Sequence, residues 1–279
     1  MRDRERTPDR SSILKRMVLF GSGGWVPSRS RDTMCIPVEL GANLFILDAG
    51  TGMRRFKSRI GSALLGRHDT ISIFLSHYHL DHIIGISYLP LNFTGKRVII
   101  YAPEPAANGR KPEEILTRLF DAPVFFPLSG FPCQVEIRAI REGEHEIDGV
   151  RVTVHPQSHT VPSVAYRIED LLYYATDRRP TPDLVQHAAG VEYLLHDASF
   201  DERRFASVTD PEARDKAMWG HSTAQDAARL ARDAGAVRLG LIHLSPSMKE
   251  AEYPALLEEA REIFPATFLP KEGRWIRFE

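Results

Sequence analysis

The clearest chemical signal in the sequence is a short loop rich in metal-binding side chains, residues 76–82 (Ser-His-Tyr-His-Leu-Asp-His). This loop directly follows the apolar segment Ile71–Leu75, which is predicted to be a buried strand. In an extended turn His77 and His79 point the same way and can bind one ion, whereas Asp81 and His82 face a second position. The alternative is a set of surface histidines with ordinary hydrogen-bond partners, but it does not explain why a buried strand leads into so many imidazoles. The loop therefore predicts a metal site.

This loop resembles the H-x-H-x-D-H hallmark of the metallo-β-lactamase superfamily, and the resemblance extends from about Met17 to His243. Within the superfamily the sequence is most similar to the RNase Z-like phosphodiesterases. Four further segments match that group in the same order: the glycine-rich residues 19–28, and residues 48–52 (Asp-Ala-Gly-Thr-Gly), 196–199 (His-Asp-Ala-Ser) and 220–223 (Gly-His-Ser-Thr). The resemblance implies an αββα sandwich, in which two mixed β-sheets lie between outer helices and the metals lie at one edge.

The resemblance also implies the other metal ligands. His159 fits the third histidine of the first metal site, Asp177 fits a carboxylate that bridges both ions, and His243 fits the last ligand of the second site. The implied ligand set is His77, His79, Asp81, His82, His159, Asp177 and His243. Mixed imidazole and carboxylate ligands suit Zn²⁺ best, with Mn²⁺ or Fe²⁺ as alternatives.

The chemistry that such a site implies is hydrolysis of a phosphodiester. Two divalent ions about 3.5–4 Å apart lower the pKa of a shared water and hold the attacked phosphorus. His221 is predicted to protonate the leaving alkoxide, because it precedes an expected helix and Asp197 can orient its imidazole and favour its charged form. The alternative is that His221 merely packs at the start of that helix. The predicted catalytic residues are therefore Asp81, His221 and Asp197.

Two departures from the RNase Z pattern concern the substrate. RNase Z enzymes that clamp a tRNA elbow usually carry a long arm between the third histidine and the bridging aspartate, whereas His159 and Asp177 are only 18 positions apart. Residues 245–248 (Ser-Pro-Ser-Met) also replace the Ser-x-Arg-Tyr segment of those enzymes. These differences favour armless relatives that open small cyclic phosphodiesters, such as phosphoribosyl cyclic phosphates or cyclic nucleotides. Cleavage at the 3′ end of tRNA stays an alternative.

Two further functions compete with this interpretation. The same metal-activated water can hydrolyse a carbon ester, a lactone or a thioester. The pair of His221 and Asp197 argues against that chemistry, because those hydrolases commonly lack such a proton donor. A metal-binding protein without turnover is the second rival, and the complete ligand set argues against it.

Apolar and turn patterns place the candidate residues at strand ends within one domain, residues 17–279. Buried strands are expected at 17–21, 44–47, 71–75, 96–101, 191–195 and 237–244. Alternating residues at 134–140 and 150–155 predict antiparallel strands, and 165–168 with 171–175 predicts a hairpin. Helices are expected at 112–120, 183–189 and 223–234, the last with a capping box formed by Ser222 and Gln225.

The composition is that of a soluble globular protein: 279 residues, of which 43% are hydrophobic and 26% charged. A net charge of −1 argues against a surface that binds nucleic acid over its whole area. Two distant cysteines predict neither a disulfide framework nor a zinc knuckle.

Without a candidate membrane span or signal peptide, the cytoplasm is the expected compartment. Residues 1–16 are expected to be a polar tail, with a nucleic-acid arm as the alternative, and the resemblance implies a homodimer.

Overall fold

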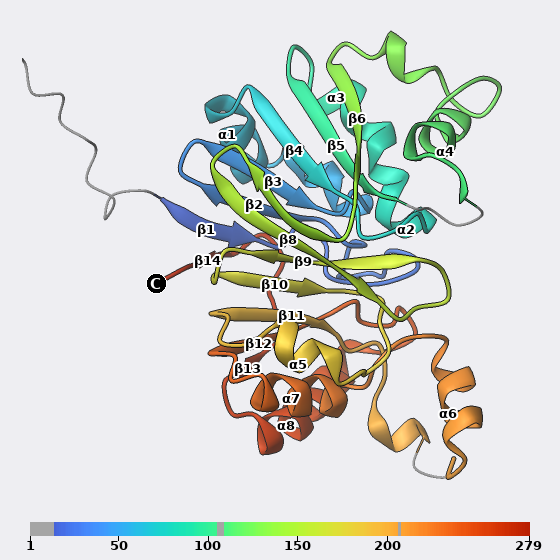
Figure 1. Cartoon of the computed structure of the whole chain (residues 1–279), viewed down its shortest axis with the longest axis vertical. Helices are drawn as coiled ribbons and strands as arrows, with labels where there is room; N and C mark the ends of the chain where they lie inside the picture. Colours follow the sequence, from blue (N-terminus) through green and yellow to red (C-terminus); the bar gives the residue numbers. More distant parts are fainter. Residues whose placement is uncertain (1–13, 105–108, 206–207) are drawn as a thin grey trace, which may run out of the picture.

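The computed structural model describes residues 14–104, 109–205 and 208–279. Within these residues two seven-stranded sheets stack face to face, with helices on the outer side of each (Figure 1). The expected tail at 1–13 lies outside the described residues. Lys15 and Arg16, which were assigned to that tail, instead pair with β2 in strand β1, so the ordered domain begins before the predicted boundary at Met17. Within the described part of the chain, every helix is too short or too polar to cross a membrane.

The first sheet is built mainly from the N-terminal half of the chain. Its order is β14-β1-β2-β3-β4-β5-β6, with parallel pairing from β3 to β6 and antiparallel pairing elsewhere. The strands are β1 (Lys15–Val18), β2 (Ile36–Leu40), β3 (Asn43–Leu47), β4 (Thr70–Phe74), β5 (Arg97–Pro103), β6 (Gln134–Ile140) and β14 (Trp275–Arg277). The helices of this half are α1 (Arg59–Arg67), α2 (Leu80–Ile83), α3 (Leu89–Asn92) and α4 (Pro112–Leu119).

The second sheet has the order β13-β12-β11-β10-β9-β8-β7, with parallel pairing from β10 to β13 and antiparallel pairing from β7 to β10. Its strands are β7 (Gly143–Ile147), β8 (Val150–Gln157), β9 (Ser163–Ile168), β10 (Leu172–Ala175), β11 (Tyr193–Asp197), β12 (Arg238–Ile242) and β13 (Thr267–Phe268). The helices of this half are α5 (Asp183–His187), α6 (Pro211–Met218), α7 (Ala224–Asp233) and α8 (Tyr253–Ile263). Both sheets are therefore mixed, as predicted.

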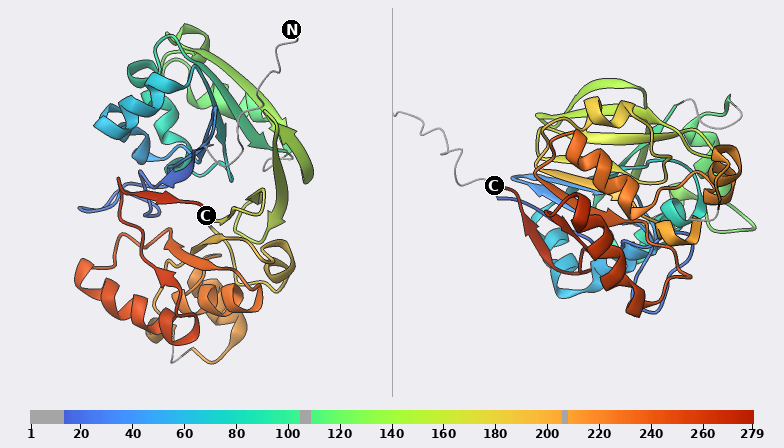
Figure 2. Two further views of the ribbon diagram at one scale, coloured as in Figure 1. Left: turned by 90° about the vertical axis from the view of Figure 1, so that its left-hand side faces the viewer. Right: turned by 90° about the horizontal axis from the view of Figure 1, so that it is seen from below.

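The apolar core forms three layers, because most strands are buried on both faces. In β3, Leu44 and Ile46 pack in the cluster under the N-terminal helices, whereas Phe45 and Leu47 pack between the sheets. A third cluster lies between the second sheet and α5, α7 and α8. Figure 2 shows the helices of the two halves on opposite sides of the paired sheets. Strands buried on both faces read as continuous apolar runs, which is why the sequence showed them clearly.

Two predicted details are wrong. The segment 134–140 was expected to be antiparallel, but β6 pairs in parallel with β5 at the edge of the first sheet, and the chain then crosses to β7 in the second sheet. A half-buried edge strand alternates apolar and polar residues whichever way its neighbour runs. The capping box of α7 is formed by Thr223 and Asp226, one residue later than predicted. The Ser222 hydroxyl instead donates to the carbonyl oxygen of Arg178, which removes it from the cap.

Candidate metal and catalytic site

The predicted site residues meet at one edge of the paired sheets. His77, Asp177 and His243 follow β4, β10 and β12 respectively, and Asp197 is the last residue of β11. The carboxyl ends of neighbouring parallel strands lie at the same edge of a sheet, so these residues are brought together by the topology. His159 is added from the connection between β8 and β9, and His221 from the turn before α7.

One group of donor atoms consists of His77, His79, His159 and Asp177, whose ligand atoms all lie within 4.8 Å of one another. The Nε2 atom of His159 is 3.4 Å from Nδ1 of His79 and 3.6 Å from Oδ1 of Asp177. The Nε2 atom of His77 is 4.0 Å from the same Asp177 oxygen. The structure thus brings together the four residues that were predicted to hold the first ion.

The second group consists of Asp81, His82 and His243. Oδ2 of Asp81 is 3.3 Å from Nε2 of His82 and 3.4 Å from Nε2 of His243. Oδ2 of Asp177 is 3.0 and 3.2 Å from the same two nitrogens. Asp177 therefore presents one carboxylate oxygen to each group, as expected of a bridging ligand.

These residues fit a divalent metal on three physical grounds. Ligands about 2.0–2.1 Å from a tetrahedral ion lie roughly 3.3 Å apart, which is close to the separations within each group. The fully buried Nε2 of His77 has no hydrogen-bond partner among the described residues, and a metal ion would satisfy it. Burial lowers the pKa of His77 well below its usual value and also lowers the pKa values of His79 and His159, so these imidazoles are held in the neutral form that binds metals.

A layer of supporting residues fixes the rings of the histidines. The carboxylate of Asp48 lies 2.7 Å from Nδ1 of His82 and accepts hydrogen bonds from the backbone N–H of Ser76 and the hydroxyl of Tyr174. Nδ1 of His159 lies 3.0 Å from the carbonyl oxygen of Gly220, to which it can donate. Such partners orient a ligating imidazole and make it a better donor. Asp48 was not predicted from the sequence to have a role, and its only signal there was its place in the loop at 48–52, directly after β3.

The backbone at the site is strained. Asp48, Asp177 and His243 have φ values of 57°, 47° and 53°, in the left-handed region that residues other than glycine rarely adopt. Close packing at the site also explains a glycine in the loop after β1, because a Cβ atom on Gly24 would lie 2.2 Å from Cε1 of His243. Gly24 therefore allows the loop to pack directly on a ligand ring.

His221 and Asp197 form a buried pair beside the donor groups. Nδ1 of His221 lies 2.8 Å from Oδ2 of Asp197, and the backbone N–H groups of Ser199 and Ser222 donate to Oδ1 of the same carboxylate. Burial by itself would lower the pKa of His221, but the charge of Asp197 raises it to about 9. The imidazole is therefore protonated at neutral pH in the metal-free protein.

His221 lies close enough to the donor groups to be considered both as a proton donor and as a metal ligand. Nδ1 of His221 is 3.9 Å from Oδ1 of Asp177, and Asp177, Asp197, His221 and His243 also form a group whose ligand atoms lie within 4.8 Å of one another. Asp197 keeps the imidazole of His221 protonated, which is the state that a proton donor needs, and the proton on Nε2 is the one available for transfer.

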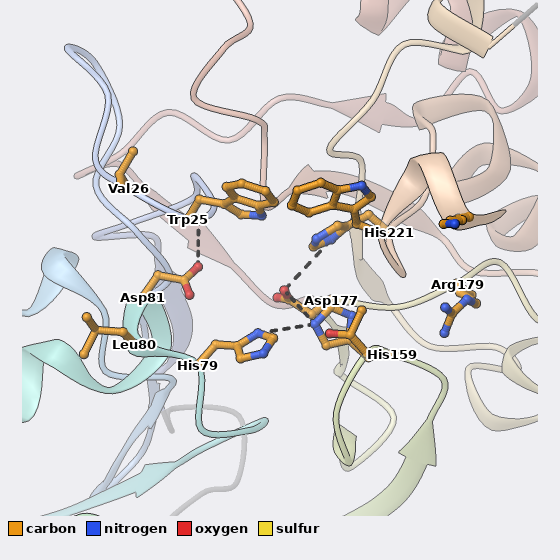
Figure 3. A pocket seen from close by; sticks show the side chains of 12 residues that line it. Trp25, Val26, His79, Leu80, Asp81, His159, Asp177, Arg179 and His221 are labelled. Carbon is orange, nitrogen blue, oxygen red and sulfur yellow. Dashed lines mark hydrogen bonds and ion pairs between the residues drawn. The ribbon is translucent and has the colours of Figure 1, made fainter. Parts of the chain in front are cut away.

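An open cavity of about 570 Å³ lies over the first donor group (Figure 3). His79, Asp81, His159, Asp177 and His221 contribute to its lining, so both donor groups and the His221–Asp197 pair can be reached from it. Its remaining lining residues are Trp25, Val26, Leu80, Thr160, Arg179, Lys216 and Trp219. A cavity of this size holds a small organic phosphate.

Comparison with known proteins adds curated relatives of similar length. The chain is 27% identical to Ribonuclease Z of Archaeoglobus fulgidus, in an alignment that covers 93% of this chain and 96% of the relative. Ribonuclease Z of Methanopyrus kandleri is also 27% identical, over 96% of this chain and 99% of the relative.

Solved structures share the fold. The metallo-beta-lactamase fold protein YhfI of Bacillus subtilis has a TM-score of 0.74 at 20% identity and covers 95% of this chain and 99% of its own. A diphosphatase from the PhnP family has a TM-score of 0.68 at 21% identity, over 95% and 98% of the two chains. The short form of human tRNase Z has a TM-score of 0.69 at 17% identity, over 95% and 99%.

A family model supplies the assignment. The model described as a beta-lactamase superfamily domain matches residues 43–244, which run from β3 to just beyond β12 and include all seven predicted ligands. The fold of that superfamily implies divalent metal ions, and the two donor groups described above supply the side chains to hold them. With its paired mixed sheets and its strand-end cluster of histidines and aspartates, the chain belongs to the beta-lactamase superfamily.

Proposed function

We propose that the protein is a dinuclear metal-dependent hydrolase, a phosphodiesterase that acts on a small phosphodiester, including cyclic ones. The observation that carries this proposal is the pair of donor groups that share Asp177, with the buried His221–Asp197 pair beside them. The proposed ligands are those of the sequence analysis: His77, His79, Asp81, His82, His159, Asp177 and His243. Zn²⁺ is the proposed metal, because imidazole and carboxylate donors at these separations suit it.

Each catalytic residue has a role that follows from its contacts. When bound, a pair of divalent ions draws charge from phosphate oxygens and makes water acidic enough to attack near neutral pH. Asp197 holds the Nδ1–H of His221, so that Nε2–H can give its proton to the leaving oxygen. Asp81 accepts a hydrogen bond from the backbone N–H of Trp25 at 2.8 Å. This contact fixes its carboxylate beside His82 and His243, at the wall of the cavity.

The proton donor favours a phosphodiester over a thioester. An alkoxide leaving from phosphorus is a strong base and needs a proton, which a protonated His221 can supply. A thiolate leaves readily without one. The raised pKa of His221 thus has a clear use in phosphodiester cleavage and little use in thioester hydrolysis.

Cleavage of tRNA is the second candidate function, because the curated relatives are named Ribonuclease Z. Against it, the chain between His159 and Asp177 is filled by the hairpin of β9 and β10, which leaves no room for a long arm there. The alignment with the Archaeoglobus fulgidus relative also spans 319 positions although this chain has 279 residues, so that relative carries insertions absent here. We therefore place the small phosphodiester first.

The test is a substrate screen with the zinc-loaded and manganese-loaded protein. Bis-p-nitrophenyl phosphate, cyclic nucleotides, a lactone, a thioester and a 3′-extended tRNA are compared under the same conditions. We expect turnover of the small diesters and none of the lactone or thioester. Preference for the tRNA by kcat/KM would establish the second candidate, and absence of turnover with every substrate would leave a metal-binding protein instead of an enzyme.

A further inference from the structure

Two exposed tryptophans stand side by side over the site. Trp25 lies in the glycine-rich loop after β1 (Figure 3), and Trp219 directly follows α6, yet their ring centroids are 5.1 Å apart with the rings tilted by 30°. Half or more of each residue is exposed, 50% for Trp25 and 57% for Trp219. An indole usually lies mostly buried, so two exposed indoles in mutual contact mark a surface built for binding.

Both tryptophans are held in place by the site itself. The backbone N–H of Trp25 donates to Oδ2 of Asp81, and Trp219 is next to Gly220, whose carbonyl oxygen lies 3.0 Å from Nδ1 of His159. Their φ values are 66° and 53°, a left-handed conformation that is a real outlier for bulky residues. Strained backbone of this kind is kept where the surroundings fix it and is concentrated at functional sites. The indoles therefore have a set position relative to the two donor groups.

The indole pair also separates two hollows. The cavity over the first donor group lies on one side, and a smaller cavity of about 270 Å³, lined in part by Ser199, Phe200 and Pro246, lies on the other. Trp25, Trp219 and His221 line both. A phosphodiester held at the donor groups can therefore place an organic arm against an indole from either cavity.

The rim of the larger cavity combines apolar and basic side chains. Of the nine exposed large hydrophobic residues in the described part of the chain, four line this one cavity: Trp25, Val26, Leu80 and Trp219. Arg179 and Lys216 line the same cavity and give it positive charge. A ligand that matches this rim has a flat apolar part joined to an anionic part, which describes a nucleotide better than a sugar phosphate.

We propose that Trp25 and Trp219 form a stacking surface for a nucleobase, so that the substrate is a phosphodiester of a nucleoside. The identification of the substrate rests on the function proposed above, whereas the binding surface does not. Every base has a π-face, and stacking on an aromatic side chain is worth enough to change affinity by roughly ten- to hundredfold. Removing one indole is expected to have an effect of that size.

The binding test uses AMP and ribose 5-phosphate, which differ only in the base, and follows tryptophan fluorescence. The chain has three tryptophans, and Trp275 lies in β14 beneath Arg16, so Trp275→Phe is the matched control. We expect AMP to bind more tightly than ribose 5-phosphate and to quench the wild type and the control equally. Trp25→Ala and Trp219→Ala should each weaken AMP binding about tenfold or more, while Trp25→Phe and Trp219→Phe should recover most of the affinity.

Equal affinities for AMP and ribose 5-phosphate, or unchanged AMP binding in both alanine variants, would overturn the proposal. Octyl phosphate is the third probe. If its affinity falls in the alanine variants while that of AMP does not, the surface binds an alkyl chain and the nucleobase is excluded. Zinc content and circular dichroism of each variant show whether a loss of binding reflects a loss of fold.

Turnover separates this proposal from the function on which it rests. The methyl phosphodiesters of adenosine and of ribose, both at the 5′ position, are compared as substrates. We expect Trp25→Ala and Trp219→Ala to raise KM for the adenosine diester with little change in kcat, and to leave the ribose diester unaffected. If neither diester is cleaved, the phosphodiesterase fails and the AMP titration still decides the stacking. If both are cleaved with equal KM, the stacking fails and the phosphodiesterase stands.

Discussion

Asp81 belongs to the second donor group and also holds the backbone of Trp25, which makes it the most informative single residue of the site. Its Oδ2 atom lies within 3.4 Å of two imidazole nitrogens of the second donor group, and it also accepts the backbone N–H of Trp25. Its pKa is lowered despite burial, because the charges of His82 and His243 favour the carboxylate. The residue lies in the first turn of the short helix α2 and is not part of the apolar core.

We expect Asp81→Ala to abolish turnover while the fold is kept. Loss of a supporting residue alone typically costs about 10–100-fold in metal affinity or activity, so loss of a ligand should cost more. The measurement is kcat/KM on bis-p-nitrophenyl phosphate together with circular dichroism. Asp69→Ala is the matched control, because that carboxylate is exposed and, among the residues that the structure describes, forms an ion pair only with Lys96. Activity within about tenfold of wild type would show that Asp81 is not a ligand.

His221 carries a prediction that depends on the leaving group. His221→Ala should lose a factor of roughly 10²–10⁴ on an alkyl diester, because the alkoxide then leaves without a proton. It should lose far less on bis-p-nitrophenyl phosphate, since p-nitrophenolate is stable enough to leave unprotonated. His145→Ala, at a half-buried position in the edge strand β7, is the control.

The same variant decides between proton donor and ligand. Zinc content should be unchanged in His221→Ala, because His221 pairs with Asp197 and is not one of the seven proposed ligands. Equal losses on the two diesters would remove His221 from the acid role. Loss of one ion would make it a ligand.

The site residues that could be predicted lie in recognisable sequence motifs. The residues that were missed acquire their role only through contacts made in the folded chain. Four of the proposed ligands lie in one hallmark loop, and His159, Asp177 and His243 were placed by matching an ordered series of motifs. Asp48 was missed because its role depends on Tyr174 and Ser76, which reach it only through the fold. The paired tryptophans were missed for the same reason, since residues 25 and 219 meet only after both sheets have formed.

At the scale of elements, the sequence predicted the central strands better than the edges. The strands β3, β4, β11 and β12 are mostly apolar and were predicted with small shifts of their ends. The short edge strands β13 and β14 have weak patterns and take their conformation from neighbours far along the chain. The start of α7 was predicted one residue early because Ser222 and Thr223 are both good capping residues, and only the tertiary contact of Ser222 with Arg178 decides between them.

The cap of α7 gives a stability prediction. The Thr223 hydroxyl accepts the backbone N–H of Asp226, and the Asp226 carboxylate accepts that of Thr223. Thr223→Ala should therefore lower the free energy of unfolding by about 1 kcal/mol, whereas Thr223→Ser keeps the hydroxyl and should lose less. Gln225→Ala should change it by less than about 0.5 kcal/mol. Urea unfolding measures the free energies of unfolding of all three variants. A larger loss in Gln225→Ala than in Thr223→Ala would support the Ser222–Gln225 capping box predicted from the sequence.

At the scale of the whole molecule, each donor group joins the two halves of the chain. His77 and His79 come from the first sheet and meet His159 and Asp177 from the second, while Asp81 and His82 meet His243 and Asp177. Without ions, the contact between the halves at this edge includes the buried carboxylates of Asp177 and Asp197 and imidazoles from both sides. Bound metal ions would neutralise these charges and link the two sheets directly, so metal binding is expected to stabilise the entire domain and not only the loops.

We therefore expect the purified protein to hold two metal ions per chain and to melt at a lower temperature once a chelator removes them. Zinc at about a hundred times its dissociation constant should restore roughly 2.7 kcal/mol, a rise of several degrees for a domain of this size. Mg²⁺ should not substitute, because it prefers oxygen ligands in octahedral geometry. Asp81→Ala should retain one ion and regain only part of the stability with zinc. Fully active protein with one ion or none, or a melting temperature that chelation leaves unchanged, would contradict a dinuclear site between the two halves.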